Sequence, residues 1–343
     1  MGKTTKLVTL ESLAAQAGVS TATASRALAG NPRLSVQTRE RITALAAEMG
    51  YEPRTKPAAG PRRRQGVIGL VVAGLKNSFS TYLLEYMHDE CAAAGYNVVL
   101  IVDSLEDPND RLTALVQEKL DGVILTTASI GSPIVDRLQA DGMPFVLAVR
   151  NSHHPGVDVI EIDNAIAGEE AARHLYALGH RRIGFLMGPQ NTSTSRDRFS
   201  GSRRFLASID APVAPELTLW GSYSHESGYS GLLTLMQRPE PPTGIICGND
   251  VIAIGALEAA HKHRINVPGD LSLVGFDDIP LAGWHAVQLT TIRQPIQEMA
   301  RVSVRCLIDR IEKRNQHPAR REILPAHLVM RATTAPPRPR RMS

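Results

Sequence analysis

Short apolar runs alternate with amphipathic segments along most of the chain after residue 66. Each run is rich in Val, Ile and Leu, and most are followed by a turn and then by a stretch with helical periodicity. Near-continuous apolar strands that alternate with helices are typical of parallel sheets covered on both faces and joined by right-handed crossovers. The predicted strands occupy residues 67–72, 96–102, 122–127, 144–149, 157–162, 182–187, 243–248 and 271–276. The pattern therefore predicts an α/β body that contains two such sheets.

Polar side chains stand at the carboxyl ends of several predicted strands. They are Asp103, Arg150, Asp163, Asn249, Asp250, Asp277 and Asp278. Open α/β sheets bind their ligands at this edge. We therefore expect a ligand cleft between two lobes.

The chain before the first predicted strand has a purely helical pattern. Residues 14–28 read AAQAGVSTATASRAL, in which Gly18 can end one helix in the left-handed conformation and Ser20 can cap the next. Ser35 can cap a third helix with apolar residues at helical spacing. The expected shared face consists of Leu13, Ala17, Val19, Ala24 and Ala27. We predict a compact three-helix head over residues 8–53.

The outward positions of the second helix of this head carry mostly short polar side chains, one methyl group and one guanidinium. They are Ser20, Thr21, Ala22, Thr23, Ser25 and Arg26. Such side chains suit phosphates and base edges of DNA, although the exposed helix of any soluble domain could carry the same Ser and Thr residues. Charge favours DNA, because residues 1–64 hold 11 Lys and Arg against 4 Asp and Glu, within a chain of net charge +4.

The remaining features limit the alternatives. The segment EPRTKPAAGPRRRQG, rich in Pro, Gly and Arg, predicts a linker at residues 54–66, and PPRPRRMS predicts a disordered basic tail at 336–343. Three distant cysteines predict neither disulfides nor zinc, and we expect no cofactor. No apolar stretch has the length of a signal-peptide core or a membrane span, so we expect a cytoplasmic protein with no membrane partner.

Several motifs in order give the chain a family resemblance. TLESLAAQAGVSTATASRAL, VQTRERITALAAEMGYEP, LGHRRIGFLMG, CGND, VPGDLSLVGFDD and LTTIRQP resemble the lactose repressor (LacI/GalR) family of transcriptional regulators. The resemblance implies a homodimer that binds a near-palindromic double-stranded DNA operator, and a periplasmic-binding-protein-like body at 67–335 that binds a small effector, often a sugar or nucleobase. Its first lobe would span about 67–163 and 294–322, and its second about 164–291 and 323–335.

The resemblance also assigns DNA contacts by position. Thr21, Ala22 and Arg26 would face bases, with Arg26 able to donate to both acceptors of a guanine. The residues that would hold phosphates are Thr9, Ser20, Thr23, Ser25 and Thr38. For Thr23 and Ser25 a solvated helix surface is the alternative.

The same resemblance assigns effector contacts. Arg198, in an Arg-x-x-Gly pattern, would bind ligand hydroxyls or a carboxylate, and Asp277 would accept hydrogen bonds from the opposite wall. The stacking, mouth and polar wall positions are Phe79, Ser80, Tyr223, Arg150 and Asn249. Alternatively, Asp277 could cap a turn, Arg198 could pair with Asp197 or a helix end, and Tyr223 could be ordinary packing. Trp284 aligns with the surface between subunits rather than with the pocket.

The linker and one pocket wall depart from the family pattern. Relatives form a hinge helix here and insert a leucine into the minor groove, whereas this chain has Gly60 at that position, followed by Pro61. We expect Arg62, Arg63 and Arg64 to contact the DNA backbone or a narrow groove, unless they are only solvated charge. NSFS at 77–80 replaces Asn-Pro-Phe-Phe, and the tail lacks the apolar heptads of a tetramer.

Two other protein classes fit the sequence less well. An exported sugar receptor would share the two-lobed body, but it would need a signal peptide and would have no use for a basic head. An enzyme would use Asp277 and Asp278 or His153, His154, His261 and His263, yet the sequence shows no phosphate-binding glycine loop, nucleophile elbow or metal-spaced set. We therefore expect a regulator and not an enzyme.

Overall fold

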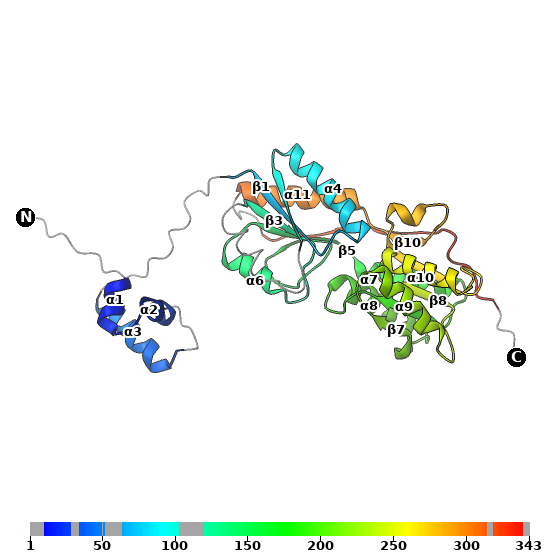
Figure 1. Ribbon diagram of the computed structural model, residues 1–343, viewed down its shortest axis with the longest axis horizontal. Helices are drawn as coiled ribbons and strands as arrows, with labels where there is room; N and C mark the ends of the chain where they lie inside the picture. Colours follow the sequence, from blue (N-terminus) through cyan, green and yellow to red (C-terminus); the bar gives the residue numbers. More distant parts are fainter. Residues whose placement is uncertain are drawn as a thin grey trace, which may run out of the picture. The chain divides into compact units, whose positions relative to one another are not determined.

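The chain divides into two compact units. The computed structural model describes residues 10–28, 34–49, 51, 64–102, 120–313 and 318–338 (Figure 1). The first unit, residues 1–63, is called the head below, and the second, residues 64–343, is called the body.

Three helices form the described part of the head. They are α1 (Leu10–Ala17), α2 (Thr21–Leu28) and α3 (Val36–Glu48). Gly18 has a φ of +66°, which places it in the left-handed conformation after α1. The Ser20 Oγ accepts a hydrogen bond from Thr23 N at 3.1 Å, and the Ser35 Oγ accepts one from Thr38 N at 3.2 Å. The predicted turn and both predicted caps are confirmed.

Small apolar side chains fill the core of the head. Those at most 8% exposed are Leu13, Ala14, Ala17, Ala24, Ala27, Ile42 and Ala46. Their small size lets the helix backbones approach closely. Arg41 of α3 donates from Nη2 to the Ala17 carbonyl at 3.1 Å, which satisfies an acceptor at the end of α1.

The body contains two six-stranded sheets, one in each lobe. The order in lobe one is β11 (Arg321–Leu324), β5 (Asp158–Ile162), β4 (Phe145–Ala148), β3 (Gly122–Leu125), β1 (Val67–Val72) and β2 (Asn97–Val102). The order in lobe two is β12 (His327–Val329), β10 (Thr290–Arg293), β9 (Ser272–Asp277), β8 (Gly244–Cys247), β6 (Ile183–Met187) and β7 (Thr218–Trp220). Every pair is parallel except β10 with β12, which is antiparallel.

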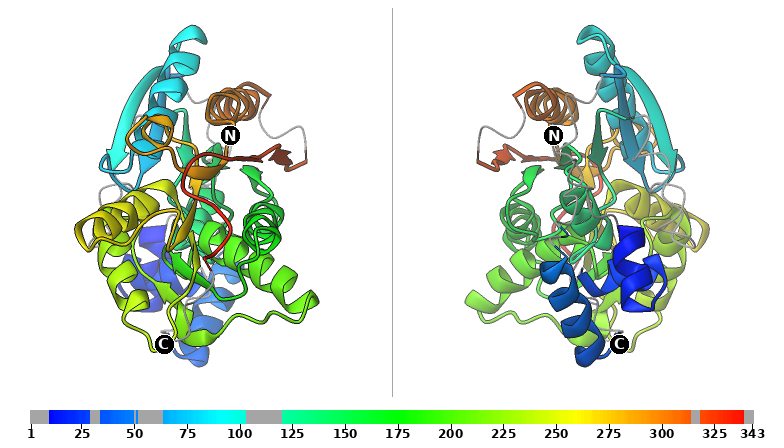
Figure 2. Two further views of the ribbon diagram at one scale, coloured as in Figure 1. Left: turned by 90° about the vertical axis from the view of Figure 1, so that its right-hand side faces the viewer. Right: turned by 90° about the vertical axis from the view of Figure 1, so that its left-hand side faces the viewer.

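Helices cover both faces of these sheets (Figures 1 and 2). Those of lobe one are α4 (Ser78–Ala93), α6 (Pro133–Ala140) and α11 (Ile296–Lys313). Those of lobe two are α7 (Asn164–Ala177), α8 (Ser193–Ser208), α9 (His225–Met236), α10 (Asp250–Lys262) and the 3-10 turns η1 (Pro215–Leu217) and η2 (Pro280–Gly283).

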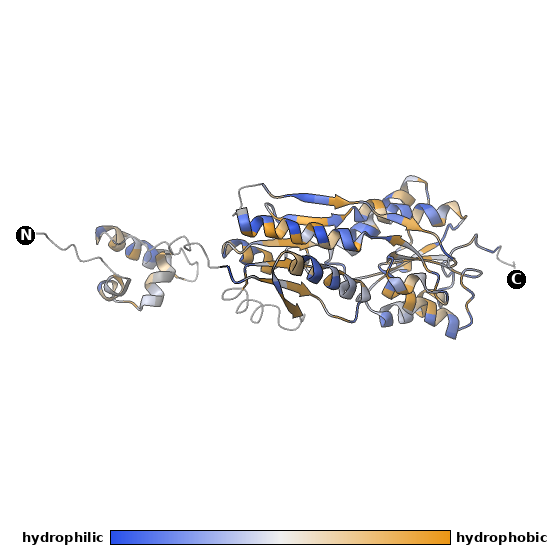
Figure 3. Cartoon of the chain, turned by 90° about the horizontal axis from the view of Figure 1, so that it is seen from above, coloured by the Kyte–Doolittle hydropathy of each residue, from blue (hydrophilic) through white to orange (hydrophobic). Residues whose placement is uncertain are grey.

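Alternation along the central strands explains the layers of lobe one. Ile124 packs into the cluster that contains the α4 residues Leu83 and Met87, whereas Val123 and Leu125 pack into the one that contains Val135 and Leu138 of α6. Successive strand side chains point to opposite faces, so α4 and α6 lie on opposite sides of the sheet. Figure 3 shows these apolar strands between helices that carry polar stripes.

All eight predicted strands are present, with ends that differ by one or two residues. Four further strands were not predicted: β7, β10, β11 and β12. The strand β10 begins with Thr290 and Thr291, which are fully buried but polar, so it lacks the apolar run on which the prediction relied.

Three segments connect the lobes, after β5, after β10 and after β11. Because β11 pairs with β5 in the first sheet, the last connection follows Leu324. The expected boundary, at about residue 322, lies two residues before this point.

The C-terminal segment is held against lobe two further than predicted. The Ala335 carbonyl lies 3.0 Å from Nε2 of His180, a side chain 1% exposed, and Arg338 Nη1 lies 3.3 Å from Asp270 Oδ1. The prediction of a disordered tail from residue 336 is thus wrong for residues 336–338, because these two contacts fix them. Residues 339–343 lie outside the described part.

Two helices of lobe two touch backbone to backbone. A Cβ atom added to Gly168 of α7 would lie 2.0 Å from the Arg198 carbonyl oxygen of α8, and one added to Gly201 would lie 1.9 Å from the Ala165 carbonyl oxygen. Only glycine fits at such a crossing. The contact sets the position of Arg198 relative to α7.

Gly168→Ala should lower the free energy of unfolding by about 2–3 kcal/mol, because α7 and α8 must separate to admit the methyl group. Urea denaturation followed by circular dichroism measures the change. Gly283→Ala is the matched control, since the nearest atom to its added Cβ is 3.6 Å away. Equal stability of the two variants would contradict the proposed packing.

Candidate functional site

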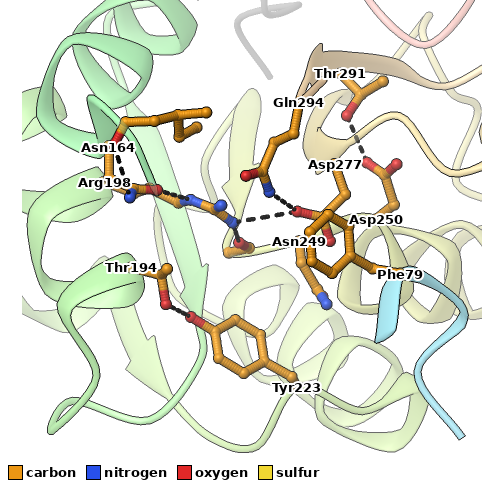
Figure 4. A network of polar contacts seen from close by, with 12 residues as sticks. Phe79, Asn164, Thr194, Arg198, Tyr223, Asn249, Asp250, Asp277, Thr291 and Gln294 are labelled. Atoms are coloured by element: carbon orange, nitrogen blue, oxygen red, sulfur yellow. Dashed lines mark hydrogen bonds and ion pairs between the residues drawn. The ribbon is translucent and has the colours of Figure 1, made fainter. Parts of the chain in front are cut away.

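A cavity of about 420 Å³, including the space open to solvent, lies between the two lobes of the body. Its lining residues are Asn77, Phe79, Ser80, Leu83, Thr126, Val149 and Arg150 from lobe one, Thr194, Arg198, Tyr223, Asn249 and Asp277 from lobe two, and Gln294 from the connection after β10. Polar side chains from both lobes therefore line one space. Figure 4 shows those of lobe two, with Phe79 of lobe one opposite them.

Arg198 is the centre of the polar network. Its side chain is 3% exposed, and its guanidinium lies 4.6 Å from the Phe276 ring centroid. Nε donates to Asn164 Oδ1 at 2.9 Å, and Nη1 donates to the Gly248 carbonyl at 2.6 Å. The Nη1 atom is also 3.6 Å from Asp277 Oδ1. The guanidinium thus has a fixed orientation at the cavity wall.

Asp277 holds a carboxyl group at the end of β9, where Gln294 Nε2 donates to it at 2.6 Å. Burial raises the pKa of Asp277 to about 6, although the neighbouring Arg198 acts in the opposite direction. Asp250 lies behind it and accepts hydrogen bonds from Thr291 Oγ1 and from Ile279 N. Burial first, and then the charge of Asp277, raise the pKa of Asp250 well above its usual value.

Two aromatic rings face the cavity from opposite lobes. The Tyr223 hydroxyl hydrogen-bonds with Thr194 Oγ1 at 2.7 Å (Figure 4). It also hydrogen-bonds with Ser195 Oγ at 2.8 Å. Its ring packs on Gly188, where an added Cβ would lie 2.4 Å from a ring carbon. Phe79 of α4 is 6% exposed. These contacts fix the Tyr223 ring as a flat wall suited to stacking.

Arg150 and Asn249 complete the polar lining. The Arg150 guanidinium lies 5.5 Å from the Tyr223 ring centroid, and its Nη1 donates to the Thr127 carbonyl at 3.3 Å. Asn249 caps α10, because its Oδ1 accepts from Ile252 N at 3.0 Å. The Asn249 side chain thus stands at the cavity wall.

All seven predicted effector contacts line this single cavity. They are Phe79, Ser80, Arg150, Arg198, Tyr223, Asn249 and Asp277. Arg198 pairs with Asp277, while Asp197 pairs with Arg196 at 3.2 Å, so the alternative pairing of Arg198 with Asp197 is wrong. Contact of these residues with a ligand stays a prediction.

Several lining residues were not among the predicted contacts. They are Leu83, Thr126, Val149, Thr194 and Gln294, together with Asn77, which was placed at the pocket wall only as part of the NSFS segment. A signal existed for Gln294, which lies within the quoted motif LTTIRQP directly after a strand. None existed for Thr194, which lies in the first turn of α8 and enters the site only through the fold.

The predicted DNA-contacting residues lie in different parts of the structure. Ser20, Thr21 and Thr23 lie at the start of α2, and the hydroxyls of Ser20 and Thr23 are 2.9 Å apart. Thr38 Oγ1 lies 2.7 Å from Ser35 Oγ. Arg64 belongs to the body and forms an exposed ion pair with Glu312 at 3.4 Å.

Several predictions lie outside the described atoms. Thr9, Gly60, Pro61, Arg62 and Arg63 are not among the described residues. The α2 backbone is described at Ala22, Ser25 and Arg26, but their side chains are not. The expected hinge and base contacts therefore stay predictions.

Two negative observations concern the described residues alone. Within them, no three His, Cys, Asp or Glu side chains group closely enough to hold a metal ion. Nor does any helix of this part combine the length and the apolar character needed to cross a membrane.

Family models match both units of the chain. Residues 9–54 match the model described as bacterial regulatory proteins, lacI family, and residues 172–334 match a periplasmic binding protein-like domain. The chain is 31% identical to the HTH-type transcriptional regulator DegA of Bacillus subtilis (strain 168), over 96% of this chain and 98% of that protein. It is 30% identical to the HTH-type transcriptional repressor CytR of Escherichia coli (strain K12), over 95% and 96%.

Solved structures agree with these relatives. The transcriptional regulator CelR in complex with cellobiose superposes with a TM-score of 0.74 and 28% identity, covering 95% of this chain and 99% of that one. The lac repressor dimer bound to operator and the anti-inducer ONPF gives a TM-score of 0.71 and 26% identity, covering 96% and 100%. The fold and these similarities agree over nearly the whole length: the chain belongs to the LacI family of transcriptional regulators.

Proposed function

We propose that the protein is a ligand-responsive transcriptional repressor that binds a near-palindromic operator as a homodimer in the cytoplasm. A sugar-like small molecule in the cavity between the lobes modulates this binding. The observation that carries the proposal is the convergence of Arg198, Asp277, Tyr223 and Phe79 on one cavity. A fixed guanidinium, a carboxyl acceptor and flat aromatic walls are the groups that bind a polyhydroxylated ring.

The proposed binding of DNA rests on the N-terminal end of α2. The caps at Ser20 and Ser35 give α2 and α3 defined N-terminal ends, and helix N-termini bind phosphates. In a helix-turn-helix the second helix enters the major groove with its first residues toward the bases. We infer that Thr21, Ala22 and Arg26 read bases and that neighbouring hydroxyls hold phosphates.

The proposed homodimer rests on Trp284. This residue directly follows η2 and is 62% exposed. Large aromatic residues are enriched at protein interfaces. Two heads in one dimer would read two half-sites, and a change in the angle between lobes would change the spacing of the heads. This is how occupancy of the cavity would alter operator affinity.

Operator recognition is tested by selecting preferred duplexes from a random pool and titrating the best one at fixed, moderate salt. Arg26→Ala should weaken the preference by about 1–3 kcal/mol, because a guanine contact is lost. Arg137→Ala removes the same charge from the exposed face of α6 and should have no effect. No preference for any duplex over random competitor, with and without candidate effectors, would refute the DNA function.

The effector is identified by a thermal-shift screen of sugars, polyols and nucleobases. A true ligand at 100 times its dissociation constant should stabilise the protein by about 2.7 kcal/mol. Arg150→Ala should reduce the shift, because Arg150 contacts the Tyr223 wall and lines the cavity. Arg137→Ala is again the control, and an unchanged shift in Arg150→Ala would contradict the site.

Arg198→Met tests the contribution of the buried pair of Arg198 and Asp277 to stability. It should lower the free energy of unfolding by about 3–5 kcal/mol at neutral pH, because Asp277 loses its buried cationic partner. Removing the guanidinium raises the pKa of Asp277 further, so the folded state retains a proton that the unfolded state releases. The loss should therefore be largest above the native pKa of about 6 and should shrink in acid, as measured by urea denaturation across pH. A loss independent of pH would contradict the pairing.

A further inference from the structure

One carboxylate holds the chain at the point where it joins the first sheet of the body. Asp121, which directly precedes β3, is 7% exposed. Its Oδ1 accepts a hydrogen bond from Gln65 N at 3.0 Å, and its Oδ2 accepts from Gly66 N at 2.6 Å and from Val67 N at 3.2 Å. Because β1 begins at Val67, the carboxylate binds the first amide of the strand and the two amides before it. We call these three contacts the anchor.

The two strands beside β1 hold the same residues through the backbone. Asn97 N, at the start of β2, donates to the Gly66 carbonyl at 2.7 Å, and Asp121 N donates to the Val67 carbonyl at 2.8 Å. Gly66 has a φ of +70°, a left-handed conformation that favours glycine. The path of the chain just before β1 is therefore determined from both sides of the strand.

The residue before the anchor is held only weakly. Arg64 Nη1 lies 3.4 Å from Glu312 Oε1 of α11, and the two side chains are 55% and 46% exposed. Exposed ion pairs of this kind contribute little to stability. The buried carboxylate of Asp121, rather than this ion pair, therefore decides at which residue the fixed part of the body begins.

Releasing residues 64–66 from the body would lengthen the path from the body to the head. An extended residue spans at most about 3.5 Å, so these residues would add up to about 10 Å. Successive base pairs of DNA are about 3.4 Å apart. The position of the anchor therefore matters on the scale of single base pairs when two heads of a dimer bind two half-sites at a fixed separation.

We propose that Asp121 is a positioning residue for operator recognition: its carboxylate fixes the point from which each head is presented and so limits the half-site separation that a dimer accepts. A wider operator is reached when the anchor opens. The added cost of binding it then includes the loss of the hydrogen bonds to Asp121. This inference rests on the proposed function, because it needs a dimer and an operator.

The anchor itself is tested without DNA, by hydrogen exchange of the full chain. Asp121→Ala removes both acceptor oxygens, so the amides of residues 65–67 should exchange at least about tenfold faster, as expected when hydrogen bonds to a charged group are lost. Asp121→Asn keeps one acceptor oxygen and should give a smaller increase. Asp270→Ala is the matched control, since it removes a carboxylate that accepts from Asn266 N at 3.0 Å in lobe two. Unchanged exchange in Asp121→Ala would overturn the proposal.

Operator spacing supplies the measurement that a merely structural role would not change. The best duplex selected with the parent is remade with its half-sites one and two base pairs further apart, and each duplex is titrated at fixed salt. The parent should bind the wider duplexes more weakly, and Asp121→Ala should reduce this loss by about threefold to tenfold, the effect of one hydrogen bond. Partial unfolding weakens binding to every duplex equally, so the ratio between duplexes reports spacing alone.

The outcomes separate this inference from the proposed function. A parent that prefers no duplex over random competitor would overturn both. A parent that binds all spacings equally, or a spacing preference that Asp121→Ala retains in full, would overturn this inference alone, as would an equal loss of the preference in Asp270→Ala. Should Asp121→Ala fail to fold, Asp121→Asn takes its place, and a spacing preference unchanged from the parent would then overturn the inference.

Discussion

The buried guanidinium of Arg198 is the interaction on which the cavity depends. It draws on three separate parts of lobe two, because Asn164 belongs to the start of α7, Gly248 follows β8, and Asp277 ends β9. A buried cation is costly unless its donors are used and its charge is balanced. Meeting this requirement brings the N-terminus of α7 and the carboxyl ends of two strands to one point, where the ligand wall forms.

The backbone is locally strained at two residues that line the cavity. Val149 has a φ of +72° and Asp277 a φ of +116°, values that are uncommon for residues with a Cβ, above all for a β-branched one. Both residues line the cavity. Strained backbone persists where the surrounding contacts determine it, as with the Gln294 amide that binds Asp277. The backbone at the cavity wall is thus held in place by its neighbours.

The sequence predicted what periodicity and family motifs encode. Eight strands, the caps at Ser20 and Ser35 and seven of the thirteen residues that line the cavity followed from apolar runs, turn chemistry and aligned positions. Prediction from the sequence failed where an element is held by tertiary contacts and lacks an apolar periodicity of its own. The strand β10 buries polar threonines that bond to Asp250 and to the segment near Thr333, and Thr194 reaches the cavity only because Gly168 and Gly201 let α8 pack tightly on α7. A single sequence does not record such partners.

The head is stabilised differently from the body, and this bears on control. Its core consists largely of alanines, which bury little apolar area, and its caps are made by exposed serines. Small units of this kind have little hydrophobic stabilisation to spare. Binding to DNA adds stability by mass action, so occupancy of an operator would itself favour the folded head. Under the proposed function, an effector in the body would have no need to act on the interior of the head, because a change in how the two heads of a dimer meet the duplex would be sufficient.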